Sequence, residues 1–225
     1  MFADFRSRRT LARLGRSVAE RLDAHNLVQK VDAPANGDQV QLYVYQNFLS
    51  PETCRMLIDK IDQGAEPSIL YKAENSKDFR TSYSCNLDRW DNEVLAIDER
   101  ICGLMGLEAR TGETLQGQRY AVGQYFKPHH DFFHTDAAYW KQERRYGGQR
   151  SWTAMIFLNE PEEGGETEFQ HLGFQMLPRT GMLFIWNNMK RDGRPNHATL
   201  HSGNPVTKGT KYIVTKWFRQ GNWLA

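Results

Sequence analysis

The 225-residue chain has little of several features that would assign it to a special class of protein. Its three cysteines, Cys54, Cys85 and Cys102, are widely spaced and odd in number, so neither a disulfide framework nor a Cys-x-x-Cys metal site is predicted. The formal net charge is only +2, which offers no broad field for nucleic acid or for a membrane surface. No apolar run approaches the roughly 18 residues that a membrane span requires. We therefore expect a soluble, cytoplasmic protein with no nucleic-acid or membrane partner.

The N-terminus also lacks the apolar core of a secretory signal. Leu11, Leu14, Val18 and Leu22 recur at helical spacing, which predicts an amphipathic helix over residues 10–25. Runs of charge are usually solvated helix faces, so an appended helix is the simpler interpretation, and a targeting or anionic-surface role is the alternative. The loop 32–38 then separates an N-terminal helical extension, residues 1–35, from a main domain, residues 36–225. The basic residues behind the alternative are Arg6, Arg8, Arg9, Arg13, Arg16 and Arg21.

In the main domain, helical patterns come first and strand patterns follow. Ser50-Pro51 is typical of a helix start and Gly64 of its end, and a second helix is predicted over 92–107. From about residue 115, short apolar runs alternate with turns, which indicates a β sandwich or barrel. The expected fold is α+β, mainly β, with the N-terminal helices packed on one face of the β core. The predicted strands are 119–126, 152–158, 166–170, 182–186, 198–201 and 212–218.

The chemistry is concentrated around His129 and Asp131. Side chains two apart on a strand point to the same face, so this imidazole and carboxylate would converge on one point. They would supply two ligands of the 2-His-1-carboxylate triad that holds non-haem Fe(II). A salt bridge at a strand end is the alternative. His201, which precedes a turn and the last long strand, is the best candidate for the third ligand, ahead of His171 and His197 in polar segments.

Lys211 follows His201 by ten residues and begins that last strand. It shares a strand face with Ile213, Thr215 and Trp217, so its ammonium group would point into the β core. A buried lysine is costly without a partner, and the carboxylate of a co-substrate would be a natural one. The alternative is a lysine that extends to water.

Four motifs in this order resemble the Fe(II)- and 2-oxoglutarate-dependent dioxygenases, in their prolyl 4-hydroxylase-like branch. The resemblance covers about residues 40–220. The motifs are Tyr120-Ala-Val-Gly-Gln-Tyr-Phe-Lys-Pro-His129-His-Asp131, Gly147-Gly-Gln-Arg150, Glu163-Gly-Gly-Glu-Thr167-Glu-Phe169, and Leu200-His201-Ser-Gly-Asn-Pro-Val together with Lys211-Tyr-Ile-Val-Thr-Lys-Trp217.

The resemblance implies a double-stranded β-helix, or jelly roll, whose open mouth holds iron. It implies three kinds of site residue. The iron ligands would be His129, Asp131 and His201; the 2-oxoglutarate pocket would contain Lys211, Tyr120 and Thr167; and Arg150, Trp217 and Phe126 would lie near the substrate, with Phe126 standing where many relatives carry a tyrosine.

We therefore expect a hydroxylase of a peptidyl residue, with prolyl 4-hydroxylation favoured, that uses Fe(II), 2-oxoglutarate and O2 and releases succinate and CO2. Ascorbate is the expected reductant. A free amino acid or small peptide natural product is the alternative substrate, and a cupin-like metal-binding module without turnover is the alternative from another class. The oligomeric state, monomer or homodimer, stays open. The segment 134–146, long and rich in polar and aromatic residues, is a candidate lid.

Overall fold

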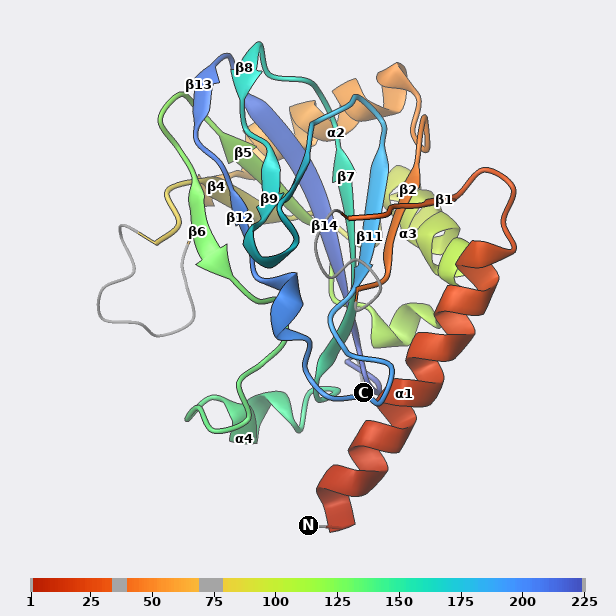
Figure 1. The fold of residues 1–225 in the computed structure, drawn as a ribbon. Helices are drawn as coiled ribbons and strands as arrows, with labels where there is room; N and C mark the ends of the chain where they lie inside the picture. The colour runs from red at the N-terminus through yellow and green to blue at the C-terminus, as the bar shows by residue number, and fades with distance from the viewer. Residues whose placement is uncertain (1, 34–39, 69–78, 224–225) are drawn as a thin grey trace.

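The computed structural model describes residues 2–33, 40–68 and 79–223. Their strands form two facing antiparallel sheets and a third, two-stranded sheet (Figure 1). The larger sheet has eight strands in the order β1-β2-β11-β7-β14-β5-β4-β3, and the smaller has the order β10-β9-β12-β6. Strands β13 and β8, which are far apart in the sequence, pair antiparallel in the two-stranded sheet. This arrangement is the mainly β core that the strand pattern predicted.

The larger sheet consists of β1 (Gln29–Lys30), β2 (Leu42–Tyr45), β3 (Glu66–Pro67), β4 (Tyr83–Asn86), β5 (Gln116–Tyr120), β7 (Arg150–Phe157), β11 (Leu183–Asn187) and β14 (Lys211–Arg219). The smaller sheet consists of β6 (Phe126–His129), β9 (Thr167–Phe169), β10 (Phe174–Met176) and β12 (His201–Gly203), and the two-stranded sheet of β8 (Glu163–Gly164) and β13 (Val206–Lys208). The helices are α1 (Phe2–Asp23), α2 (Pro51–Gly64), α3 (Asn92–Met105) and the short α4 (Trp140–Glu143).

Helices α1, α2 and α3 cover one face of the larger sheet, as predicted (Figure 1). Alternate residues of the central strand β7 explain why the helices pack on this face and the smaller sheet on the other. Trp152 and Ile156 pack in the same cluster as residues of these helices, whereas Met155 and Phe157 belong to a second cluster between the sheets. Because strand side chains alternate between faces, one central strand supplies both cores.

Side chains cap the N-termini of two helices, and the cap of α2 was predicted from the sequence. The Ser50 hydroxyl accepts a hydrogen bond from the backbone N–H of Thr53, 3.2 Å away, and α2 ends at Gly64. Asp91, which was not predicted, caps α3 in the same way, and α3 ends at Met105, followed by Gly106 at a φ of 66°, two residues before the predicted boundary at 107. All three cysteines are free, which also agrees with the prediction.

Three boundaries were predicted wrongly. The run 119–126 is not one strand, because a turn in which the N–H of Gln124 donates to the carbonyl of Ala121 separates β5 from β6. Residues 197–199 form a 3-10 turn, and the strand predicted over 198–201 begins only at His201. Helix α1 begins at Phe2 rather than near residue 10.

Helix α1 is closely packed against the main domain. Val18 and Leu22 are buried in the cluster beneath the larger sheet, and the Arg21 guanidinium donates to the carbonyls of Gly103 and Leu104 at the end of α3. The proposed boundary at residue 35 lies outside the described residues, so the division into 1–35 and 36–225 stays a prediction. None of the described helices combines the length and apolar character needed to cross a bilayer.

Candidate active site

Two histidines and one aspartate meet between the smaller sheet and the larger one. His129 ends β6 and pairs directly with His201, the first residue of β12, and Asp131 follows two residues after β6. One ligand atom from each residue lies within 4.8 Å of the other two. His129 Nε2 is 3.8 Å from Asp131 Oδ1, and His201 Nε2 is 3.9 Å from Asp131 Oδ2. The structure therefore brings together the three residues predicted to hold a metal.

The outer nitrogens of both histidines are held by backbone carbonyls. His129 Nδ1 lies 2.8 Å from the carbonyl oxygen of Lys127, and His201 Nδ1 lies 2.9 Å from that of Thr199. A carbonyl can only accept a hydrogen bond, so Nδ1 must carry the proton in each ring. Nε2 of each neutral ring then presents a lone pair toward Asp131, which is the tautomer that metal ligation requires.

Burial and neighbouring charge favour the same protonation states. Burial, reinforced by the His201 imidazole, lowers the pKa of His129 to about 3. For Asp131, burial alone would raise the pKa, but His201, His129 and Arg150 hold it below the usual range. A neutral imidazole and an ionised carboxylate at neutral pH are the forms that bind a divalent metal.

Aromatic side chains fix the planes of both imidazoles. Phe126 stacks on His129 with ring centroids 3.6 Å apart, and Phe169 stacks on His201 at 5.3 Å. Trp186 meets the His201 ring edge-on at 5.1 Å. Phe126, predicted to lie near substrate, is therefore in direct contact with a predicted metal ligand.

A small cavity of about 40 Å³ opens beside the triad. It lies between the two sheets, because its walls come from both of them. Apart from the triad, it is lined by several residues that the sequence singled out, namely Tyr120, Phe126, Thr167, Lys211 and Trp217. Arg150 does not line it.

Lys211 is the charged residue that stands out in this cavity. It is only 2% exposed, so the alternative of a lysine that reaches water is wrong. Among the residues that the structure describes, none forms a hydrogen bond or an ion pair with its Nζ, which lies 5.4 Å from the ring centre of Tyr120 and 5.5 Å from that of Phe157. Burial lowers the pKa of Lys211 to about 7, against a weaker opposite effect of Glu166. The lysine is therefore poised to gain a partner that carries negative charge.

Comparisons with known proteins agree with this geometry. Residues 115–219 match the 2OG-Fe(II) oxygenase superfamily. Probable prolyl 4-hydroxylase 8 of Arabidopsis thaliana is 32% identical over 200 residues, which cover 78% of this chain and 67% of the relative. Prolyl 4-hydroxylase 5 of the same plant is 30% identical over 250 residues, which cover 93% of this chain and 83% of the relative.

The chain belongs to the prolyl 4-hydroxylase-like 2OG-Fe(II) oxygenases.

Solved structures support the same fold. The viral collagen prolyl hydroxylase of Paramecium Bursaria Chlorella virus-1, in complex with 2OG, superposes with a TM-score of 0.62 at 26% identity and covers 88% of this chain and 97% of that one. A Pseudomonas putida prolyl-4-hydroxylase superposes with a TM-score of 0.54 at 18% identity, covering 93% and 98%, and so supports the fold alone. The predicted jelly roll is confirmed, and the protein is a 2-oxoglutarate-dependent dioxygenase whose family uses Fe(II), 2-oxoglutarate and O2.

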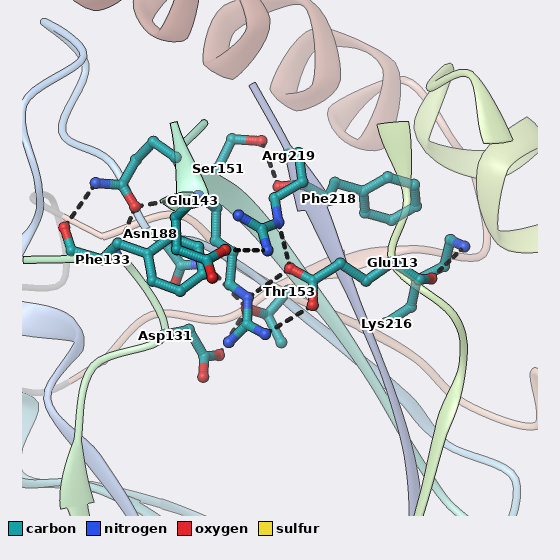
Figure 2. Close-up of polar contacts among 12 residues, drawn as sticks. Glu113, Asp131, Phe133, Glu143, Ser151, Thr153, Asn188, Lys216, Phe218 and Arg219 are labelled. Atoms are coloured by element: carbon teal, nitrogen blue, oxygen red, sulfur yellow. Dashed lines mark hydrogen bonds and ion pairs between the residues drawn. The ribbon is translucent and has the colours of Figure 1, made fainter. Parts of the chain in front are cut away.

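In this oxygenase, Glu113, Glu143 and Arg219 belong to a buried network of charges (Figure 2), which also contains Arg150. Its guanidinium makes two hydrogen bonds, of 2.6 and 2.7 Å, to the carboxylate of Glu113, and Arg219 lies 2.5 Å from the same carboxylate. Arg219 also donates to Glu143, 2.8 Å away. Burial would raise the pKa of Glu113, but Arg150 and Arg219 hold it below the usual range. Arg150 contacts a wall of the cavity, because its guanidinium stacks 4.2 Å from the centre of the Trp217 ring.

Two further residues of the oxygenase site were missed in the sequence. Glu113 precedes the strand region and carries no motif, so its role appears only once Arg150 and Arg219 face it. Gln118 lines the cavity, accepts a hydrogen bond from the Tyr120 hydroxyl at 2.8 Å and donates to Thr215 at 3.1 Å. The signal for Gln118 was available, because it shares a strand face with Tyr120 two residues later.

The candidate lid, residues 134–146, contains α4 and is attached to the oxygenase core near its C-terminal end. Glu143 is buried and pairs with Arg219, whereas Arg144 and Arg145 beside it are exposed. At the other end, Gln149 accepts from the N–H of Phe133 and donates to its carbonyl. These contacts hold both ends of the segment, and its closure over substrate stays a prediction.

Proposed function

We propose that this oxygenase hydroxylates prolyl residues of a peptide or protein at C4, with Fe(II) and 2-oxoglutarate. The observation that carries the proposal is that Lys211, buried without a partner among the described residues, lines the same cavity as the His129–Asp131–His201 triad. A triad alone would also suit other metals. A buried ammonium in the same cavity as the triad adds the demand for an anionic co-substrate.

One set of residues would bind the metal, and another would bind the co-substrate. Fe(II) would be held by His129, Asp131 and His201, an arrangement that leaves positions open for other ligands. Lys211 would pair with the distal carboxylate of 2-oxoglutarate, and this attraction is stronger in a partly dry cavity than in water. When bound, the metal and co-substrate supply the oxidising chemistry that converts 2-oxoglutarate and O2 to succinate and CO2 and adds one oxygen atom to a C–H bond.

The walls of the cavity supply orientation. Tyr120 and Thr167 line the same cavity as Lys211 and would position the co-substrate. Trp217 and Phe126 offer aromatic faces, which suit the apolar ring of proline, and Arg150 holds the Trp217 plane by stacking on it. The curated relatives are named as prolyl 4-hydroxylases, which favours proline over a free amino acid or a small peptide natural product. We propose ascorbate as the reductant that maintains Fe(II).

The decisive test is incubation of proline-containing peptides, and of a lysate, with the enzyme, Fe(II) and 2-oxoglutarate. Mass spectrometry should find the addition of one oxygen atom on proline. The variants His129→Ala and Asp131→Ala should form no substrate-dependent succinate. His171→Ala, in the exposed turn after β9, is the matched histidine control and should keep full turnover. Modification of another residue type would reject proline as substrate, and full turnover by the two triad variants would reject the site.

A further inference from the structure

Two consecutive hydrogen bonds, from Asn188 to Thr153 and from Thr153 to Asp131, hold the carboxylate of Asp131 (Figure 2). The hydroxyl of Thr153 lies 2.7 Å from Asp131 Oδ2, and the side-chain amide of Asn188 donates to the same hydroxyl at 2.9 Å. Thr153 and Asn188 are fully buried, and Asp131 is 5% exposed. The three residues come from different parts of the fold: the loop after β6, the middle of β7 and the residue after β11. These two hydrogen bonds therefore connect one predicted ligand with the central strands of the larger sheet.

The direction of each hydrogen bond follows from the number of protons. Thr153 has a single hydroxyl proton, and an ionised carboxylate can only accept. Because the Asn188 Nδ2 group donates to Thr153 Oγ1, the hydroxyl proton is free to point at Asp131 Oδ2. If the Asn188 amide were rotated, one hydroxyl proton would face two acceptor oxygens. Only the first arrangement satisfies both bonds, so Asn188 sets the direction in which Thr153 donates.

The two oxygens of Asp131 consequently differ. Both oxygens lie near a triad nitrogen, Oδ1 at 3.8 Å from His129 Nε2 and Oδ2 at 3.9 Å from His201 Nε2. Only Oδ2 accepts from Thr153, and Oδ1 forms no hydrogen bond with any described residue. We propose that Thr153, oriented by Asn188, positions Asp131 as a single-oxygen ligand that offers Oδ1 to the metal. This inference rests on the proposed function, since it assumes that the triad holds Fe(II). A carboxylate that bound through both oxygens would occupy a position that the co-substrate or O2 needs.

The framework explains why Asp131 needs such support. Asp131 lies beyond the end of β6, which is an edge strand of the smaller sheet. Thr153 lies in β7, which is paired on both sides, with Trp186 of β11 and Trp217 of β14 opposite it. Asn188 is held through its own backbone, which donates to the carbonyl of Ser151 at 2.8 Å. The hydrogen-bond chain thus connects a ligand that follows an edge strand to a strand that is paired on both sides.

The test is the direct measurement of Fe(II) affinity under anaerobic conditions, without 2-oxoglutarate or peptide. Thr153→Val keeps the shape of the side chain but removes the hydroxyl, and it should weaken Fe(II) binding by roughly 10- to 100-fold. Thr153→Ser keeps the hydroxyl and should bind nearly as the parent does. Ser151→Ala, which removes another buried hydroxyl from the same strand, bonded to the carbonyl of Phe218, is the matched control and should leave affinity unchanged. Parental affinity in folded Thr153→Val would overturn the inference.

A double-mutant cycle tests the role of Asn188. Asn188→Leu should weaken Fe(II) binding in the parent but have no further effect in Thr153→Val, because Asn188 acts through that hydroxyl. Additive losses would overturn this part. If valine at 153 prevents folding, judged by circular dichroism, Thr153→Ala takes its place with the same expectations. Failure of the parent to bind Fe(II) would contradict the proposed function itself, whereas tight binding by the parent and by every variant would contradict only the positioning role.

Discussion

Two groups of buried positive charge lie along the same strand, β14, and they differ in their partners. Near its C-terminal end, Lys216 pairs with Asp98, and Arg219 shares Glu113 with Arg150 and also bonds Glu143. At its first residue, Lys211 has no acidic partner among the described residues. Burying a charge costs several kcal/mol unless it is paired. The charges of the paired group are therefore neutralised within the protein itself. The buried charge of Lys211 would be neutralised only by an anion that binds.

The largest effect on the free energy of unfolding is expected from removing the charge of Glu113, because this disrupts the paired group. Glu113→Gln keeps the volume of the side chain but leaves two buried guanidinium groups with one fewer negative charge. Loss of one partner from a buried pair costs roughly 3–5 kcal/mol of unfolding free energy. Urea denaturation followed by circular dichroism would measure this loss. Unchanged stability would mean that the network contributes little, and that Glu143 alone compensates Arg219.

Removing the charge of Lys211 should have the opposite effect: it should weaken ligand binding without lowering the stability of the ligand-free protein. Lys211→Met removes the charge and keeps the length of the side chain, so 2-oxoglutarate should bind about 2–5 kcal/mol more weakly, at least thirtyfold. The ligand-free protein should be as stable as the parent or more stable, because an unpaired buried charge is gone. Calorimetric titration with Mn²⁺ in place of Fe(II), together with thermal denaturation, gives both values. Lys208→Met, an exposed lysine on β13, is the matched control. A destabilised variant with normal 2-oxoglutarate affinity would show that Lys211 stabilises the fold and does not bind the co-substrate.

The same lysine should give 2-oxoglutarate binding a distinct pH dependence. Because burial lowers the pKa of Lys211 to about 7, the ligand-free enzyme is half deprotonated there, and affinity should fall about fivefold between pH 7 and pH 8. The unfolded chain keeps this proton up to a pKa near 10.5, so it binds more protons than the folded chain between those values. The ligand-free protein should therefore gain stability as pH rises through this window.

Lys211→Arg is the control for the pH effect. A guanidinium stays protonated throughout, so both the decline in affinity and the stability gain due to residue 211 should disappear. Calorimetry at several pH values, compared between parent and variant, separates this residue from all other titrating groups. An equal decline in both proteins would assign the effect elsewhere.

The sequence predicted the elements whose signals are local. Helices α2 and α3 were placed to within two residues because Ser50, Gly64 and Gly106 act on the adjacent backbone. The early start of α1 was missed because residues 5–9 are largely exposed, as Phe5 shows, and carry no apolar period. The turn between β5 and β6 was missed although Gly123, at a φ of 80°, offered a signal.

The site was predictable to the extent that its residues fall in motifs. The motifs around β6, β12 and β14 led to the triad and Lys211, although Asp131 lies beyond the end of β6 rather than on one strand with His129. Thr153, Asn188 and Glu113 act only across the fold: their partners are 22, 35 and 37 residues away in sequence. Each is an ordinary polar residue until the sheets bring it to its partner. Sequence patterns therefore found the residues that define the chemistry, but not the residues that hold them in place.

The smallest effect is expected where charges are paired but exposed. Arg179 and Glu160 form an ion pair of 2.8 Å at the surface, with 58% and 44% of their side chains exposed. Water screens this pair, so Glu160→Gln should change the unfolding free energy by less than about 1 kcal/mol and leave 2-oxoglutarate affinity unchanged. The variant matches Glu113→Gln in chemistry and differs in burial, so the two together separate the effect of pairing from that of burial. A loss as large as that expected for Glu113→Gln would show that pairing alone, rather than burial, accounts for the contrast between the two groups on β14.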